Sequence, residues 1–179
     1  KIEHNNMIKN GIIGYPLKNP RSITIWREYF KKKRISASMN KFEVKPSNLN
    51  KFIKDFRKNK KFKAAAVTMP YKKKIYKLID NYDNFAKTSK SINLIVKQKD
   101  KLFGYNTDVY GANETIKKIL AKYKLIIIIG LGGTGSAIFN YLYSKYKRKK
   151  YLLISKKFVF KNSGKIKIKK KLTKNVLKD

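Results

Sequence analysis

Ile126-Ile127-Ile128-Ile129-Gly130-Leu131-Gly132-Gly133-Thr134-Gly135-Ser136-Ala137 joins an apolar run to a glycine-rich turn. Four consecutive isoleucines are typical of a buried strand. The glycines allow a tight turn and a close approach of the backbone to a pyrophosphate at the start of a helix. The pattern predicts a strand, a turn and a helix through Tyr146, which is the form of a dinucleotide site. A strand-to-helix turn without a ligand is the alternative, and the apolar strand and amphipathic helix on either side favour the nucleotide.

Strand-like and helix-like segments alternate along the rest of the chain. Expected strands cover residues 11–15, 38–44, 62–67, 91–97, 102–105, 124–129 and 151–155, with 91–97 and 102–105 forming a hairpin about residues 99–101. Expected helices begin near Ser22, Ser47, Pro70, Asp108 and Gly133, with Ser22 and Ser47 as N-caps. This alternation predicts an α/β fold with mainly parallel sheets. We expect a first α/β domain over residues 1–106 and the start of a Rossmann-type, doubly wound nucleotide-binding domain over residues 107–179. Only one β-α-β unit fits in the second part, so the chain is interpreted as C-terminally truncated, and residues 158–179 receive no assignment.

Composition narrows the function further. The 179 residues include no cysteine and a single histidine, His4, which argues against thiolate or histidine metal sites and against Ser-His-Asp chemistry. No signal peptide or membrane span is visible, so a cytoplasmic protein is expected. The net charge of +36 comes almost entirely from lysine, which accompanies abundant Ile, Asn, Tyr and Phe. Because A/T-rich codons account for that composition and arginine is sparse, we expect no specific nucleic-acid partner.

The choice of cofactor follows from a missing acid. An NAD site usually offers Asp or Glu about 20 residues after the glycine loop, to hold the ribose 2′-hydroxyl. No acid occurs between Glu114 and Asp179, and the next strand runs instead into Ser155-Lys156-Lys157. Two cations suit the 2′-phosphate of NADP, although lysines are common throughout the chain. The missing acid therefore favours NADP more than the lysines do.

Two segments carry candidate catalytic groups. Residues 67–72 (Val-Thr-Met-Pro-Tyr-Lys) predict a strand ending at Thr68 and a helix beginning at Pro70, with Lys72 beside the carboxyl edge of the sheet. Residues 104–108 (Gly-Tyr-Asn-Thr-Asp) place the carboxylate of Asp108 at a helix start, in a chain with 10 Asp and Glu against 46 Lys and Arg. Reduction of a ketone by hydride transfer needs a proton donor, and a lysine with a nearby carboxylate is the remaining natural pair. By spacing alone, however, Lys72 is one of many solvated lysines.

Asn93 lies in an apolar strand-like segment, Ser91-Ile92-Asn93-Leu94, and its amide needs hydrogen-bond partners. The partner of this amide is either a turn, in a structural hydrogen bond, or a hydroxylated substrate, and both interpretations stay open. Periodicity alone favours the structural bond.

Taken in order, these segments resemble the shikimate dehydrogenase family. The likeness spans roughly residues 11–157 and rests on several motifs with fitting spacing. Residues 14–22 resemble the family's N-terminal substrate loop. The other matches to family motifs are residues 67–72 with N-V-T-x-P-x-K, 91–93 with G-A-x-N-T, 104–111 with G-x-N-T-D-x-x-G, 130–133 with G-x-G-G, and 155–157 with N-R-T.

The resemblance implies an NADP-dependent oxidoreductase that reduces 3-dehydroshikimate to shikimate in aromatic amino-acid and chorismate biosynthesis, acting as a monomer or homodimer. It implies that Lys72 and Asp108 form the catalytic pair, Lys72 protonating the developing alkoxide and Asp108 orienting it. It also implies that the carboxylate and hydroxyls of the cyclic acid are bound by Ser22, Thr68 and Asn93. The implied NADP-binding residues are Gly130, Gly132, Gly133, Thr134, Ser155, Lys156 and Lys157, with Lys156 in place of the family's arginine.

Departures from the family pattern cluster on the substrate side. Pro20 replaces the first serine of the family's S-x-S, Ala66 replaces the Asn of N-V-T, and Leu94 replaces the Thr that follows Asn93. These changes keep two alternatives open. One is a paralogue acting on quinate or another cyclic hydroxy acid, and the other is a non-catalytic basic module that binds nucleic acid or acidic partners.

Overall fold

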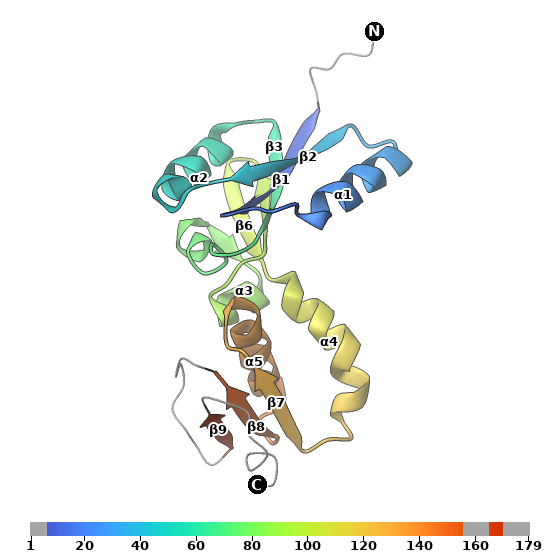
Figure 1. Cartoon of the computed structure of the whole chain (residues 1–179), viewed down its shortest axis with the longest axis vertical. Helices are drawn as coiled ribbons and strands as arrows, with labels where there is room; N and C mark the ends of the chain where they lie inside the picture. The colour runs from blue at the N-terminus through green and yellow to red at the C-terminus, as the bar shows by residue number, and fades with distance from the viewer. Residues whose placement is uncertain (1–6, 156–164, 170–179) are drawn as a thin grey trace. The chain divides into compact units, whose positions relative to one another are not determined.

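A computed structural model describes residues 7–155 and 165–169 of the chain (Figure 1). Contacts between residues divide the chain into two compact units, Lys1–Asn106 and Thr107–Asp179. Each unit combines helices with a sheet, which confirms the predicted α/β class.

The first unit holds six strands and three α-helices in its described part. The strands are β1 (Ile8–Gly14), β2 (Ala37–Glu43), β3 (Phe62–Val67), β4 (Asn81–Tyr82), β5 (Leu94–Gln98) and β6 (Lys101–Tyr105). The α-helices are α1 (Arg21–Lys32), α2 (Leu49–Lys58) and α3 (Asn84–Ser89), and the 3-10 helices are η2 (Pro46–Asn48) and η3 (Ile75–Leu78).

These strands form one sheet in the order β2-β1-β3-β5-β6-β4. β1 pairs in parallel with β2 and β3, whereas β5 pairs antiparallel with β3 and β6. The predicted hairpin between β5 and β6 is confirmed, with Lys99 at φ 54° in its turn. Because so short a connection only allows an antiparallel return, β5 runs antiparallel to both of its neighbours. The other pairs of this sheet, β4 with β6 included, are parallel, so the sheet is mixed and mainly parallel as predicted.

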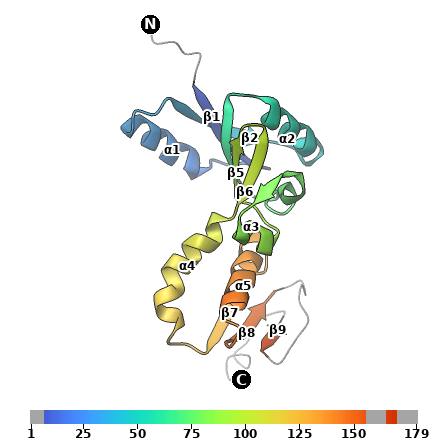
Figure 2. The ribbon, with the colours of Figure 1, turned by 180° about the vertical axis from the view of Figure 1, so that it is seen from behind.

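Successive side chains of β1 point to opposite faces of this sheet. Ile13 packs into the main core with Ile53 and Phe56 of α2. Ile12 packs into a smaller cluster with Phe30 of α1. Figure 2 shows α1 and α2 on the two sides of the sheet, as these contacts require.

The prediction of a helix beginning at Pro70 is wrong. Residues 69–74 form turns, and only η3 follows them. Tertiary contacts explain the difference, because they fix the segment at both ends. The Tyr71 hydroxyl donates to Val44 O, and Asp80 Oδ2 accepts from the Leu102 N–H at 2.7 Å.

The two predicted serine caps are also wrong. Pro20 is the N-cap of α1, and Ser22 is the second helical residue. Ser47 lies in η2, so that Asn48 is the N-cap of α2. A side-chain cap forms on α3, a helix the periodicity did not predict, where Asp83 Oδ1 accepts from the Ala86 N–H at 2.6 Å.

The second unit is an all-parallel arrangement. Its described elements are α4 (Thr107–Leu120), β7 (Leu125–Ile129), α5 (Gly133–Lys145), β8 (Lys150–Ile154) and β9 (Ile166–Lys169), with strand order β7-β8-β9. β7 pairs in register with β8, which pairs in register with β9. This is the predicted start of a doubly wound fold, and β9 falls in the stretch that received no assignment.

Within the described residues, the isoleucine run of β7 is half-buried on one face and exposed on the other. Ile126 and Ile128 pack against the core of the second unit, whereas Ile127 and Ile129 are 39% and 68% exposed. The difference from the prediction arises because β7 is an edge strand in this sheet and the described helices cover one side of it.

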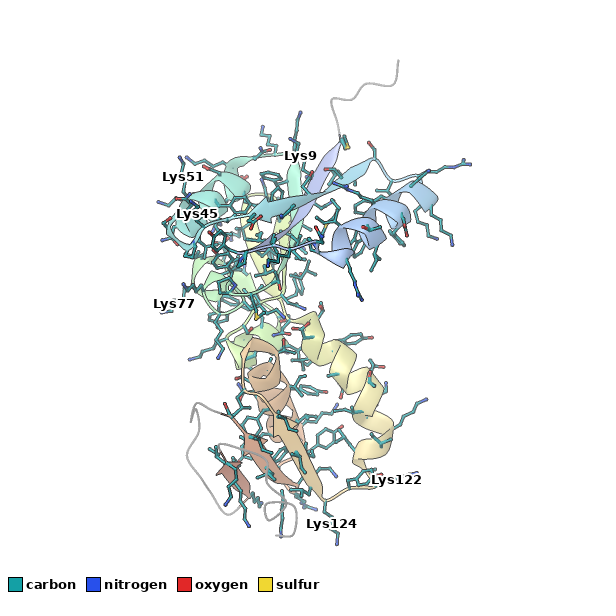
Figure 3. The ribbon with its side chains drawn as sticks, in the orientation of Figure 1. Lys9, Lys45, Lys51, Lys77, Lys122 and Lys124 are labelled. Atoms are coloured by element: carbon teal, nitrogen blue, oxygen red, sulfur yellow. The ribbon has the colours of Figure 1, made fainter. Side chains whose placement is uncertain are left out.

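The lysines form a cationic surface. Figure 3 shows Lys9, Lys45, Lys51, Lys77, Lys122 and Lys124 projecting away from the ribbon. Lys97 is an exception, because it is buried in β5 and its Nζ donates to Asn59 O at 2.7 Å. Burial lowers the pKa of Lys97. Over residues 7–155 and 165–169, every helix falls short of the length and apolarity that crossing a membrane requires.

Candidate active site

The carboxyl ends of β1 and β3 meet in the first unit and carry two loops of the candidate substrate site. The Tyr15 N–H donates to Met69 O at 3.2 Å, and the Thr68 N–H donates to Ile13 O at 2.9 Å. Both loops contain a cis-proline peptide, Tyr15–Pro16 and Met69–Pro70. Thr68 therefore lies where β1 and β3 both end, at the edge where ligands bind in α/β sheets.

Gly14 permits this close approach. A Cβ at Gly14 would lie 2.5 Å from Cγ2 of Thr68 and 2.6 Å from Cδ2 of Leu17, so any larger residue would displace one of these side chains. The loop beyond is tied to β2, because the Leu17 N–H donates to Glu43 Oε1 at 3.0 Å. The hydrogen bond from Lys41 is the main cause that lowers the pKa of Glu43, and the Leu17 N–H adds to it.

Lys72 is held through its backbone and through its neighbour. Lys72 O accepts from the Ile92 N–H at 2.8 Å, and the side chain of Tyr71 is fully buried with its hydroxyl on Val44 O. Burial raises the pKa of Tyr71, and the nearby Tyr15 adds to the rise. Lys72 itself is half-buried, unlike the exposed Lys73. Tyr71 is a contributor that the sequence reasoning did not single out.

Asn93 lies between the ends of two strands. Its N–H donates to Tyr105 O at 3.0 Å, and its carbonyl accepts from the Val67 N–H at 2.8 Å. Through Val67 and the neighbouring Ile92, the Asn93 backbone is tied to the segment that carries Thr68 and Lys72. Three of the predicted site residues, Thr68, Lys72 and Asn93, thus come together at one edge of the sheet.

Ser22 lies in the first turn of α1, the helix that follows the Tyr15–Pro16 loop. Its Oγ is buried and has no hydrogen-bond partner among the described residues. A buried hydroxyl without a partner is costly, and such groups occur at sites that receive a ligand.

Asp108 and the glycine loop come together in the second unit. Asp108 is the second residue of α4, where a carboxylate is favoured by the helix dipole. Thr134 Oγ1 donates to Asp108 Oδ2 at 3.1 Å, which links the acid to the first turn of α5. The predicted site residues therefore form two groups, one in each unit.

The glycines of the loop differ in backbone conformation and in the space that a Cβ would find. Gly130 has φ +89°, a backbone conformation that other residues rarely adopt. Gly132, the N-cap of α5, has φ −68° and ψ −163°, and a Cβ there would meet nothing within 4 Å. A Cβ at Gly135 would lie 1.8 Å from Gly130 O. Gly135 was not among the predicted site residues, although Gly130-x-Gly132-x-x-Gly135 has the spacing that would have identified it.

The segment predicted to bind the 2′-phosphate is described only in part. Ser155 directly follows β8, and its N–H donates to Lys169 O at 2.9 Å. Lys156 and Lys157 lie outside the described residues. Within the described part of the chain, no three His, Asp or Glu side chains gather in a way that could hold a metal ion.

Known proteins place this architecture in a family. Residues 12–95 match the family profile of the shikimate dehydrogenase substrate binding domain. The NADP(+)-type shikimate dehydrogenase of Clostridium beijerinckii is 33% identical over 148 residues, which cover 82% of this chain and 54% of that protein. Shikimate dehydrogenase 1 of Peptoclostridium difficile has a similar structure, with a TM-score of 0.76 and 25% identity over 90% of this chain and 61% of the other.

A further shikimate dehydrogenase, solved in complex with NADP+, has a TM-score of 0.72 and 27% identity over 83% of this chain and 51% of the other. The chain spans about half the length of the curated relatives it matches. In sequence and in structure, the chain belongs to the shikimate dehydrogenase family.

Proposed function

We propose that the protein is an NADP-dependent shikimate dehydrogenase that reduces 3-dehydroshikimate to shikimate on the route to chorismate and the aromatic amino acids. The observation that carries the proposal is the convergence of Thr68, Lys72 and Asn93 at the carboxyl edge of the first-unit sheet. That edge lies within the segment matched by the family's substrate-binding profile.

Unit by unit, the residues fit the two ligands. In the second unit, a Cβ at Gly132 would meet no atom of the described chain within 4 Å, so packing within the chain does not explain the glycine. A pyrophosphate bound in that open space would explain it. Bound NADPH would supply the hydride. The residues proposed to hold it are Gly130, Gly132, Gly133, Thr134, Ser155, Lys156 and Lys157. The absence of acids from residue 115 to residue 178 favours the phosphorylated cofactor over NAD.

Lys72 and Asp108 are proposed to act on the same substrate oxygen. The Lys72 ammonium would donate the proton that the new alkoxide needs, and its charge would stabilise that oxygen as it becomes negative. Asp108 would accept a hydrogen bond from the substrate hydroxyl and orient it. The hydrogen bond from Thr134 to Asp108 would fix the carboxylate relative to the glycine loop.

Ser22, Thr68 and Asn93 are proposed to bind the carboxylate and ring hydroxyls of the substrate. The unpartnered, buried Oγ of Ser22 supports that role. Pro20 cannot supply the hydroxyl that the family's first serine provides, and the exposed Arg21 beside Ser22 offers a charged donor in its place.

The test is reduction of NADP+ by shikimate, followed at 340 nm with the purified gene product. Lys72→Ala and Asp108→Asn should each lower kcat by about 10²- to 10⁴-fold, the usual share of general acid–base catalysis. Lys73→Ala is the matched control, since it removes the same charge from the adjacent, exposed position and should leave kcat within about twofold.

The outcomes separate the candidate functions. Equal losses in Lys72→Ala and Lys73→Ala would contradict the assigned role of Lys72. Turnover of quinate without turnover of shikimate would assign the chain to a paralogue with another cyclic acid. Absence of turnover with both acids, together with nucleic-acid binding that is lost at high salt, would overturn the enzyme proposal.

A further inference from the structure

A buried asparagine closes β6 at the end of the first unit. Asn106 is 1% exposed and directly precedes Thr107 and Asp108. Its Nδ2 donates to Ser91 O at 3.0 Å and approaches Ser89 Oγ at 3.2 Å. One side-chain amide therefore joins the end of β6 to the loop between α3 and β5, which carries Asn93.

The rest of the network fixes both sides of this link. The Asn106 N–H donates to Asp83 Oδ1 at 3.3 Å, the same oxygen that caps α3. Ser89 Oγ donates to Phe85 O at 2.8 Å, so Ser89 belongs to the last turn of that helix. The amide thus contacts a loop whose other end is already anchored by α3.

Packing alone does not explain an asparagine here. Asn106 Oδ1 and Ser91 Oγ are buried and have no hydrogen-bond partner among the described residues. Each such group costs stability, whereas an apolar side chain of the same size would avoid the cost. A polar group that is retained at this cost holds a particular arrangement of the backbone rather than adding to the core.

We propose that Asn106 is a positioning residue for the substrate side of the site. By holding Ser91 O, its amide fixes the loop two residues before Asn93, and so sets where the Asn93 side chain meets a substrate hydroxyl. The backbone bonds at Ile92 and Asn93 to Lys72 and Tyr105 complete the support. The claim about substrate rests on the proposed function, whereas the claim about the loop does not.

The kinetic test compares Asn106→Leu with Lys97→Met, which removes the hydrogen bond of another buried polar residue in the same unit, at a position that carries none of the site groups. Asn106→Leu should raise the KM for shikimate about tenfold and leave the KM for NADP+ within twofold. Lys97→Met should change neither. In an Asn93→Ala background the effect of Asn106→Leu should disappear, because the residue it positions is gone.

Asn106→Asp supplies a second variant that keeps the shape of the side chain. Its ionised carboxylate cannot donate to Ser91 O, whereas the protonated form can. The shikimate KM of this variant should be raised about tenfold at pH 8, where the carboxylate is ionised. A parental KM at pH 8 would contradict the role of the amide donor.

Amide hydrogen exchange tests the loop without any substrate. Asn106→Leu should raise the exchange rates of the Ile92 and Asn93 amides at least tenfold relative to Lys97→Met. If these amides stay protected, the positioning role fails even in an active enzyme. If they lose protection but shikimate neither binds nor turns over in the parent, the proposed function fails while the structural role of Asn106 stands.

Discussion

Two glycine substitutions in the second unit should separate the folding of the glycine loop from its binding of a dinucleotide. In Gly135→Ala the new Cβ would lie 1.8 Å from Gly130 O, and real Cβ contacts essentially never fall below 3.0 Å. The start of α5 must therefore move away from the loop by more than 1 Å. Forced overpacking costs about 1–3 kcal/mol, and a clash with a backbone atom belongs in the upper half of that range because the backbone cannot simply rotate away. The better helix propensity of alanine offsets about 1 kcal/mol, which leaves a net loss of about 1–2 kcal/mol.

Gly132→Ala is the matched variant. A Cβ there meets nothing within 4 Å, and φ −68° with ψ −163° suits any residue. The gain from a stiffer unfolded chain, about 0.4–1 kcal/mol, is balanced by the weaker N-cap, so the stability should stay within about 0.5 kcal/mol of the parent. The methyl group would instead fill the space proposed for the pyrophosphate and weaken NADP+ binding by about tenfold or more.

The assay is thermal unfolding followed by circular dichroism, together with calorimetric titration of NADP+. Gly135→Ala should lower the melting temperature of the second unit by roughly 5–15 °C, because about 1 kcal/mol shifts a unit of this size by 4–8 °C. Gly132→Ala should melt with the parent but bind NADP+ more weakly. Parental affinity in Gly132→Ala would refute the proposed pyrophosphate site, and parental stability in Gly135→Ala would refute the packing argument.

Two further predictions concern pH. Burial alone would raise the pKa of Asp80, but the hydrogen bonds from Leu102 N–H and Arg57 outweigh it and lower the pKa. Asp80→Asn should therefore lower the free energy of unfolding by about 1 kcal/mol at pH 7. Urea unfolding should show the stability difference between variant and parent shrinking as the pH falls below about 3.9. A difference that stays constant with pH would contradict the ionic role of Asp80. Burial raises the pKa of Tyr151 to about 12, so its neutral hydroxyl contributes stability below pH 10 that is lost as the pH rises to 12. Tyr151→Phe removes the hydrogen bond to Leu142 O and should lower the free energy of unfolding by about 1 kcal/mol at pH 7. In urea unfolding, the variant should lose less stability than the parent as the pH rises from 10 to 12. An equal loss in variant and parent would contradict the role of the Tyr151 hydroxyl.

Much of the fold could be predicted from local patterns. The run from Ile126 to Ala137 predicted a strand, a turn and a helix, and β7 and α5 follow it closely. The hairpin of β5 and β6 was predicted because a short polar turn separates two apolar strands. In each of these cases the local sequence preference and the tertiary structure agree.

The failures lie where tertiary contacts override local preference. The segment after Pro70 has helical spacing at Ile75, Leu78 and Ile79, yet the buried Tyr71 and the paired Asp80 hold it in turns. The roles of Tyr71 and Asn106 could not be predicted, because both depend on hydrogen bonds to residues distant in sequence. The candidate site was predicted through the motif resemblance, since spacing alone did not distinguish Lys72 from the other lysines.

The most direct test of the central claim is a titration of the isotope-labelled protein with shikimate, observed by the amide signals of the first unit. We expect saturable shifts at Thr68, Lys72 and Asn93, which Lys72→Ala should weaken and Lys73→Ala should leave unchanged. Saturable shifts confined to other parts of the sheet, or no shifts at millimolar shikimate, would contradict the claim that the carboxyl edge of β1 and β3 is the substrate site.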